Sequence, residues 1–245
     1  MIGEIIIKDD GSCSSTRIIL QGILVFKYYQ NPWNRKLVIT KYEYRNMIQL
    51  NALCVYCGSS AGNDPKIISN AQELGKTLAQ RNITVVYGAA KIGVMGAVAQ
   101  AALDAHGKVI GVIPEFLKIK EVVHTGLTEL IVNDTMHERK MKLQELSDGF
   151  ITLPGGFGTM EELFEVLTWS QLALHQKPVG MLNVNGFYDD LLAALKNMVD
   201  KGFLKQENLD ILLVDTSVDG LLAQMEAFTP QAMPKWLQAS LAAKK

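Results

Sequence analysis

The chain has 245 residues, of which 48% are hydrophobic and 20% charged, a profile typical of ordinary folded proteins rather than disordered or fibrous ones. Lys and Arg number 24 against 25 Asp and Glu, so the chain as a whole offers no basic field to nucleic acid or to an anionic membrane. The most apolar early run, residues 18–26, is interrupted by Gln21 and Gly22 and is too short for a membrane span. It also lacks the flanks of a secretory signal.

The first 46 residues differ from the rest in charge. They hold seven Lys or Arg and four acidic residues, a net charge of +3, which leaves −4 for the remainder. Four of the seven tyrosines also lie there. We expect residues 1–46 to be a dispensable, loosely ordered extension, or a segment upstream of a misassigned start at Met47. Residues 47–228 then form the main domain, and residues 229–245 a C-terminal tail.

The cysteines indicate a reducing compartment, here the cytoplasm. Cys13, Cys54 and Cys57 are an odd number in a chain of this size, which argues against a disulfide framework. The spacing of Cys54 and Cys57 allows a redox or zinc interpretation, but no second pair of zinc ligands accompanies them. Both lie in or beside an apolar run, so we interpret them as structural.

From residue 50 onward, short apolar runs alternate with helical patterns. In chain order, the first predicted elements are a strand at 53–56, a helix at 64–81, a strand at 83–87, an alanine-rich helix ending at 106, and strands at 108–113 and 127–132. A helix at 134–147, a strand at 150–153 and a helix ending near 175 follow. The last are a strand at 178–182, a helix at 187–201, a strand at 211–214 and a helix at 217–228. Such alternation is typical of a parallel sheet covered on both faces. The sequence predicts an α/β fold, a single Rossmann-like doubly wound sheet whose ligands bind at the carboxyl ends of the strands.

The glycine-rich turn from Pro154 to Glu162 is the strongest motif. It follows a strand and opens a helix, so its backbone N–H groups can approach an anion. It matches neither the Walker loop nor the dinucleotide fingerprint, and a mononucleotide or sugar phosphate fits it better. An alternative stays open at this point, because Thr159 and Glu162 have the spacing of a capping box.

Two charged residues are predicted on the inner faces of their helices. Glu162 shares one face of its helix with Val166, Trp169 and Ala173, which places its carboxylate at the crevice by the strand ends. Glu161 and Glu165 need only complement the helix dipole. Arg139 shares a stripe with Met136, Leu143 and Leu146. A buried guanidinium needs a partner or a ligand. The alternative is a purely structural bridge to a carboxylate.

The turns after the first two strands offer further donors. The turn from Gly88 to Gly96 can present backbone N–H groups to a phosphate, or can simply allow tight helix packing. Ser59 and Ser60 can bind ribose or phosphate, or can cap a helix.

Together these residues resemble the Lonely Guy family of cytokinin riboside 5′-monophosphate phosphoribohydrolases. The matching pieces are residues 57–60, the turn at 88–96, Met136-His137-Glu138-Arg139-Lys140 and the turn at 154–162, and the likeness runs from about residue 47 to 228. The resemblance implies hydrolysis of the N-glycosidic bond of a nucleoside 5′-monophosphate without metal or redox cofactor. It implies Arg139 and Glu162 as the catalytic pair. The substrate-binding residues expected with them are Glu121, Lys140, Gly155, Gly156, Phe157, Gly158, Thr159, Met160, Thr168, Ser59 and Gly88.

One residue departs from the family pattern. The family's second turn usually reads Gly-Gly-Gly or Gly-Gly-Ala, whereas this chain has Gly88-Ala89-Ala90. Either the backbone at Ala89 avoids a positive φ, or the pocket is slightly altered.

Members of the family were long labelled lysine decarboxylases, but no lysine here has a recognisable pyridoxal-phosphate setting. The long helix after the glycine turn typically pairs subunits in this family. Its apolar residues Leu163, Phe164, Leu167 and Leu174 are consistent with a homodimer.

The leading hypothesis is therefore an N-glycosidase acting on a cytokinin riboside monophosphate or on AMP. A non-catalytic nucleotide or molybdenum-cofactor carrier on the same fold is the alternative. A single-strand DNA-binding relative is disfavoured by the near-neutral charge. No nucleic-acid or membrane partner is expected.

Overall fold

The computed structural model describes residues 25–28, 37–40, 48–118 and 123–230. The chain divides into two units, residues 1–46 and 47–245. In the first unit, strand β1 (Val25–Tyr28) pairs antiparallel with β2 (Leu37–Thr40), and the sequence analysis predicts neither strand. The expectations for the rest of residues 1–46, and for residues 231–245 of the tail, lie outside the described residues.

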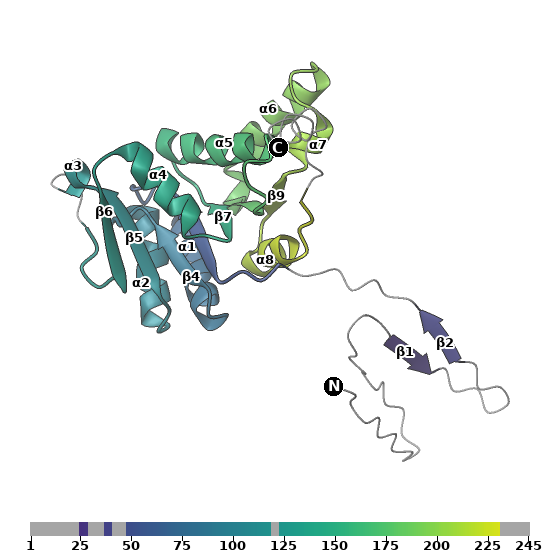
Figure 1. The fold of residues 1–245 in the computed structure, drawn as a ribbon, viewed down its shortest axis with the longest axis horizontal. Helices are drawn as coiled ribbons and strands as arrows, with labels where there is room; N and C mark the ends of the chain where they lie inside the picture. Colours follow the sequence, from purple (N-terminus) through teal and green to yellow (C-terminus); the bar gives the residue numbers. More distant parts are fainter. Residues whose placement is uncertain (1–24, 29–36, 41–47, 119–122, 231–245) are drawn as a thin grey trace, which may run out of the picture. The chain divides into compact units, whose positions relative to one another are not determined.

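The second unit is built on a seven-stranded parallel sheet (Figure 1). Its strands in chain order are β3 (Ala52–Tyr56), β4 (Thr84–Tyr87), β5 (Val109–Pro114), β6 (Glu129–Asn133), β7 (Gly149–Thr152), β8 (Val179–Leu182) and β9 (Leu212–Asp215). Their spatial order is β6-β5-β4-β3-β7-β8-β9, and every pairing is parallel. The chain builds outward from β3 on one side and from β7 on the other, so the topological switch point lies between these two strands. The predicted doubly wound α/β fold is confirmed.

The helices are α1 (Pro65–Gln80), α2 (Gly93–Asp104), α3 (Glu115–Lys118), α4 (Met136–Glu145), α5 (Phe157–Gln171), α6 (Asp189–Asp200), α7 (Gln206–Leu209) and α8 (Val218–Glu226), with a 3₁₀ turn at Val184–Gly186. The start of α1 follows its sequence signal, because Asp64 accepts a hydrogen bond from the Lys66 N–H and Pro65 occupies the first helical position. Helices α3 and α7 and the 3₁₀ turn are not predicted, since three or four residues are too few to show a helical period.

Two hydrophobic clusters lie on opposite faces of the sheet, and β3 contributes to both by alternation. Leu53 and Val55 face the cluster formed with α1, α2 and α8, whereas Cys54 and Tyr56 face the cluster formed with α4, α5 and α6 (Figure 1). Buried strands of this kind are apolar on both sides, which explains their continuous apolar runs in the sequence.

Several helices end earlier than predicted because a residue just beyond them adopts a left-handed conformation. Helix α5 ends at Gln171 instead of near residue 175, since Ala173 has φ +56°. The Leu174 N–H then donates to the Trp169 carbonyl at 2.8 Å, and the Ala173 N–H donates to the Ser170 carbonyl. This is a Schellman ending with alanine where glycine is usual. His106 ends α2 in the same way, with φ +60°.

None of the helices in the described part of the chain is long and apolar enough to cross a bilayer.

Candidate active site

Three strand-end turns meet at the switch point and are joined by backbone hydrogen bonds. The Gly58 N–H after β3 donates to the Pro154 carbonyl after β7 at 3.1 Å, and the Gly58 carbonyl accepts from the Met95 N–H at 3.2 Å. A side chain at Gly155 cannot fit, since a Cβ there would lie 2.8 Å from the Gly58 nitrogen. Two glycines of the predicted motifs thus allow the close approach of the turns after β3 and β7.

The N-terminus of α5 opens from this meeting point. Gly156 is its N-cap residue and provides no side-chain hydrogen bond. A Cβ built on Gly156 or on Gly158 would have no atom within 4 Å, and Phe157 is 97% exposed. The first N–H groups of a helix have no partner within the helix. This end of α5 therefore presents backbone donors beside open space, as an anion site requires.

The capping-box interpretation of Thr159 and Glu162 is wrong. The helix begins at Phe157, so both residues lie inside its first two turns, where Thr159 is 4% exposed. The capping box of this region belongs to α4, where Thr135 and Glu138 bind each other's backbone N–H groups. The Glu162 side chain is thereby free for another contact.

That contact is an ion pair with Arg139. Arg139 Nη1 lies 3.0 Å from Glu162 Oε1, and both side chains are 8% exposed. Arg139 Nε also donates to the Val112 carbonyl in β5 at 3.2 Å. Burial raises the pKa of Glu162 above its usual value, although the Arg139 charge opposes that shift. The two residues predicted as a catalytic pair are brought together by helices that begin 21 residues apart in the sequence.

Gly88 leaves room for the Arg139 guanidinium. A Cβ at Gly88 would lie 2.5 Å from Arg139 Nη2 and 3.2 Å from Met95 Sδ. Gly88 is therefore required for the position of Arg139, and it borders the ion pair. The second partner of Arg139, the Val112 carbonyl, was not predicted, because no sequence pattern marks a backbone acceptor.

Lys140 forms a second connection between α4 and α5. Its Nζ lies 2.5 Å from Glu161 Oε1 and 2.8 Å from Glu165 Oε1, and its side chain is 14% exposed. The interpretation of these two glutamates as mere complements of the helix dipole is thus wrong. Two adjacent cations, Arg139 and Lys140, and two adjacent carboxylates, Glu161 and Glu162, were the sequence signal that could have indicated ion pairs between these two helices.

Four other residues were expected to bind the substrate: Met160, Ser59, Thr168 and Glu121. Met160 is half-buried and packs against the hydrophobic cluster formed with α4, α5 and α6. Ser59 is exposed in the turn after β3. Thr168 lies six residues beyond Glu162, about 9 Å along the helix axis, and its hydroxyl donates to the Phe164 carbonyl of its own helix. The structure does not bring Thr168 to the ion pair. Glu121 lies outside the described residues.

The turn after β4 adopts a positive φ at Ala89. Its φ is +67°, which excludes the first of the two alternatives, that the backbone at Ala89 avoids a positive φ. The Ala89 methyl is fully buried and points toward Gly111 of β5, where a Cβ would fall 2.8 Å from it. The Ala89 carbonyl accepts the His124 N–H at 2.9 Å, which holds the strained turn in place.

Cys54 and Cys57 are buried free thiols. Burial raises the pKa of both thiols, so neither resembles a reactive thiolate. Among residues 48–118 and 123–230, no group of three His, Cys, Asp or Glu side chains could hold a metal ion.

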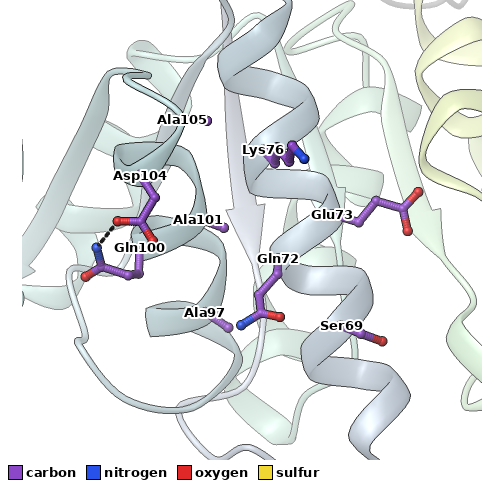
Figure 2. A pocket seen from close by; sticks show the side chains of 9 residues that line it. All are labelled: Ser69, Gln72, Glu73, Lys76, Ala97, Gln100, Ala101, Asp104 and Ala105. Carbon is purple, nitrogen blue, oxygen red and sulfur yellow. Dashed lines mark hydrogen bonds between the residues drawn. The ribbon is translucent and has the colours of Figure 1, made fainter.

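A groove of about 600 Å³ lies elsewhere, between α1 and α2 (Figure 2). Its lining includes charged and amide side chains of both helices and three alanines in or just after α2, and the Gln100 side-chain amide donates to Asp104 across one turn of α2 at 2.7 Å. Neither Arg139 nor Glu162 lines it. These two residues belong to α4 and α5 on the opposite face of the sheet.

The chain is 44% identical over 179 residues to cytokinin riboside 5′-monophosphate phosphoribohydrolase LOG2 of Arabidopsis thaliana, covering 73% of this chain and 84% of the relative. It is 45% identical to the probable phosphoribohydrolase LOGL1 of Oryza sativa subsp. japonica, over 72% of this chain and 79% of the relative. The chain belongs to the Lonely Guy family.

A family model described as a possible lysine decarboxylase matches residues 95–225, which include α4, α5 and the glycine turn. The same fold is found in solved structures of low sequence identity. A molybdenum cofactor binding protein from Rippkaea orientalis superposes with a TM-score of 0.56 at 23% identity, covering 74% of this chain and 98% of that chain. The molybdenum cofactor carrier protein of Chlamydomonas reinhardtii gives 0.54 at 21% identity, covering 80% and 100%. At such identity these structures show the fold alone.

Proposed function

We propose that this chain hydrolyses the N-glycosidic bond of a cytokinin riboside 5′-monophosphate, releasing the free base and ribose 5-phosphate. The observation that carries the proposal is the buried Arg139–Glu162 ion pair beside the uncapped N-terminus of α5. The curated relatives named above support this activity. We place the activity in residues 47–228, which include the described sheet.

The N-terminus of α5 supplies the phosphate site. Its free N–H groups at residues 157–159 and the positive end of the helix dipole favour a dianion. Gly156 and Gly158 let the phosphate approach the backbone, because no Cβ stands in the way. Binding the phosphate fixes the ribose relative to the side chains of the site.

Glu162 and Arg139 act on the ribose. As the bond between C1′ and the base nitrogen breaks, positive charge develops on the ribose ring, and the Glu162 carboxylate stabilises it. The same carboxylate accepts a proton from water as the remaining hydroxyl bonds to C1′ and the bond between C1′ and the base breaks. The departing base takes one proton from solvent and Glu162 returns its proton to solvent, so the net reaction adds one water. Arg139 holds Glu162 ionised and oriented, since its charge opposes the effect of burial on the Glu162 pKa.

No observation on the described residues specifically favours the alternative function, that of a non-catalytic carrier. A carrier needs to bind its cargo, but it does not need a desolvated carboxylate with a raised pKa paired to a buried guanidinium. The solved carriers share only the fold with this chain at 21–23% identity.

We also propose a homodimer that pairs through α5. Of the four apolar residues expected at the interface, Leu163 is fully buried in the core, so its expected place there is wrong. Phe164 is 38% exposed, Leu167 is half-buried, and Leu174, just beyond the helix, is 64% exposed. Exposed apolar side chains of this kind are typical of a subunit interface. The free thiols of Cys54 and Cys57 support a reducing compartment such as the cytoplasm.

The experiment compares AMP with isopentenyladenosine 5′-monophosphate as substrates of the purified chain, with the released base separated by chromatography. We expect base from the prenylated nucleotide at a higher kcat/KM than from AMP. Equal or better use of AMP would reassign the substrate, and no base from either would overturn the proposed function.

A further inference from the structure

The second ion-pair cluster between α4 and α5 points to a role for Lys140 that differs from substrate binding. We propose that Lys140 is a positioning residue, which fixes the rotation of α5 through Glu161 and Glu165 so that Glu162 faces Arg139. This inference rests on the proposed function, because it assigns a residue that supports the same reaction.

The first argument is the occupancy of the Lys140 amine. Its Nζ contacts Glu161 Oε1 and Glu165 Oε1 at 2.5 and 2.8 Å. Burial lowers the pKa of Lys140, but the hydrogen bonds to both carboxylates overcome this effect and raise it. One cation between two carboxylates leaves a net charge of −1. A dianionic phosphate would be repelled there, whereas the uncapped end of α5 carries no such charge.

The second argument is helical geometry. Successive residues of a helix are about 100° apart, so Glu161 and Glu165, four residues apart, lie on one face. Glu162 projects from the adjoining face, and Arg139 and Lys140 are likewise neighbours on α4. Two adjacent ion pairs between two helices define the rotation of one against the other, which a single pair cannot do.

The third argument is repulsion. Like charges at i and i+4 destabilise a helix. Without Lys140, the Glu161 and Glu165 carboxylates would repel each other. The Glu165 side chain is only 17% exposed, so its charge would be left unpaired and poorly hydrated. The first turns of α5 would relax by rotating Glu165 toward water, and Glu162 would turn away from Arg139.

The test uses steady-state kinetics of base release from isopentenyladenosine 5′-monophosphate by the full chain. Lys140→Met removes the amine and keeps much of the length. The double variant Glu161→Gln/Glu165→Gln removes its partners and leaves Lys140 in place. We expect each to lower kcat about tenfold or more with KM within about twofold, since orientation of Glu162 is lost and the phosphate site is kept. The combined triple variant should be no worse than either.

Two controls make the result specific. Lys140→Arg retains a cation that can reach both carboxylates and should restore most of kcat. Lys142→Met removes a surface ion pair with Glu145 on the same helix, 3.2 Å long, and should leave kcat and KM unchanged. A rise in KM in Lys140→Met, with wild-type kinetics in the glutamate double variant, would instead place Lys140 on the substrate and overturn the proposal. Lower thermal stability without any change in kcat would overturn it as well.

A readout that needs no turnover separates this proposal from the proposed function. The Arg139 Nε–H is protected by the Val112 carbonyl, and its NMR signal can be assigned by its loss in Arg139→Lys. We expect its exchange with solvent to quicken at least tenfold in Lys140→Met and in the glutamate double variant, but not in Lys140→Arg. Unchanged exchange in all three would refute the positioning role, even if the wild-type chain released no base.

Discussion

Arg139 Nη1 and Glu162 Oε1 lie 3.0 Å apart, between two side chains that are each 8% exposed. Arg139 lies beside Gly88 after β4 and donates to the Val112 carbonyl of β5, and Glu162 belongs to the second turn of α5, whose N-terminus has no side-chain cap. Removing two charges from water costs several kcal/mol each, which their attraction repays only in good geometry. A pair of this kind is therefore weak evidence for stability and better evidence for chemistry.

The first prediction separates these two roles. Glu162→Leu should lower the free energy of unfolding by about 3 kcal/mol, because it leaves the Arg139 guanidinium buried without its partner. The double variant Arg139→Met/Glu162→Leu should regain most of that loss, measured by urea unfolding, yet release base at least about 100-fold more slowly than the wild type. A double variant as unstable as the single one would show that the pair is chiefly structural.

The second prediction concerns pH. In the proposed mechanism the carboxylate form of Glu162 is the active one, and burial raises the pKa of Glu162 above the usual 4.5. Log kcat should therefore fall with a slope of about 1 as the pH drops through a midpoint above 4.5. Circular dichroism at each pH checks that the fold persists. A kcat that stays level down to pH 4.5 in folded protein would contradict the role of Glu162.

The third prediction uses the histidines. His124 and His175 each accept a backbone N–H at Nδ1, from Gly126 and Lys177, so both rings must be neutral in the fold. Burial lowers both pKa values. Their contribution to stability is complete above the unfolded-state pKa of about 6.5 and is lost as the pH falls below it, because the unfolded chain then binds more protons. The free energy of unfolding should decrease from pH 7 to pH 5, and His175→Gln should reduce that decrease. An equal slope in that variant would exclude His175 as a cause.

The fourth prediction concerns backbone strain. Ala173 has φ +56° at the end of α5 and is half-buried, so Ala173→Gly should raise the free energy of unfolding by up to about 1 kcal/mol. Ala89 has φ +67°, but its methyl is fully buried, so the gain in Ala89→Gly should be smaller. Because that methyl points toward Gly111, kcat/KM should stay within about twofold. A larger change in kcat/KM would mean that Ala89 alters the pocket.

Features that depend on local sequence patterns could be predicted, whereas contacts between distant parts of the chain could not. Strands such as β5 and β7 were located to within about a residue, because buried strands are apolar runs bounded by Gly or Pro. Arg139 and Glu162 were each singled out by a local stripe, but their contact depends on how α4 and α5 lie on the sheet. Local patterns do not encode that placement. The end of α5 was misplaced because Ala173 adopts a conformation that glycine usually signals.

The same limit explains the misread glutamates. Glu161 and Glu165 have ordinary roles near a helix start when α5 is considered alone, and only Lys140 on α4 gives them another. The Thr159 capping motif failed for a related reason, since the glycines at 156 and 158 let the helix begin before the motif that normally opens one.

We propose that Glu162 makes this chain a nucleoside 5′-monophosphate glycosidase. The most direct measurement is single-turnover release of base from isopentenyladenosine 5′-monophosphate by wild type and by Glu162→Gln, with nucleotide binding measured in parallel by calorimetry. We expect base from the wild type, at least about 100-fold less from the variant, and similar binding of nucleotide by both. Binding without base release by the wild type, or equal release by Glu162→Gln, would contradict it.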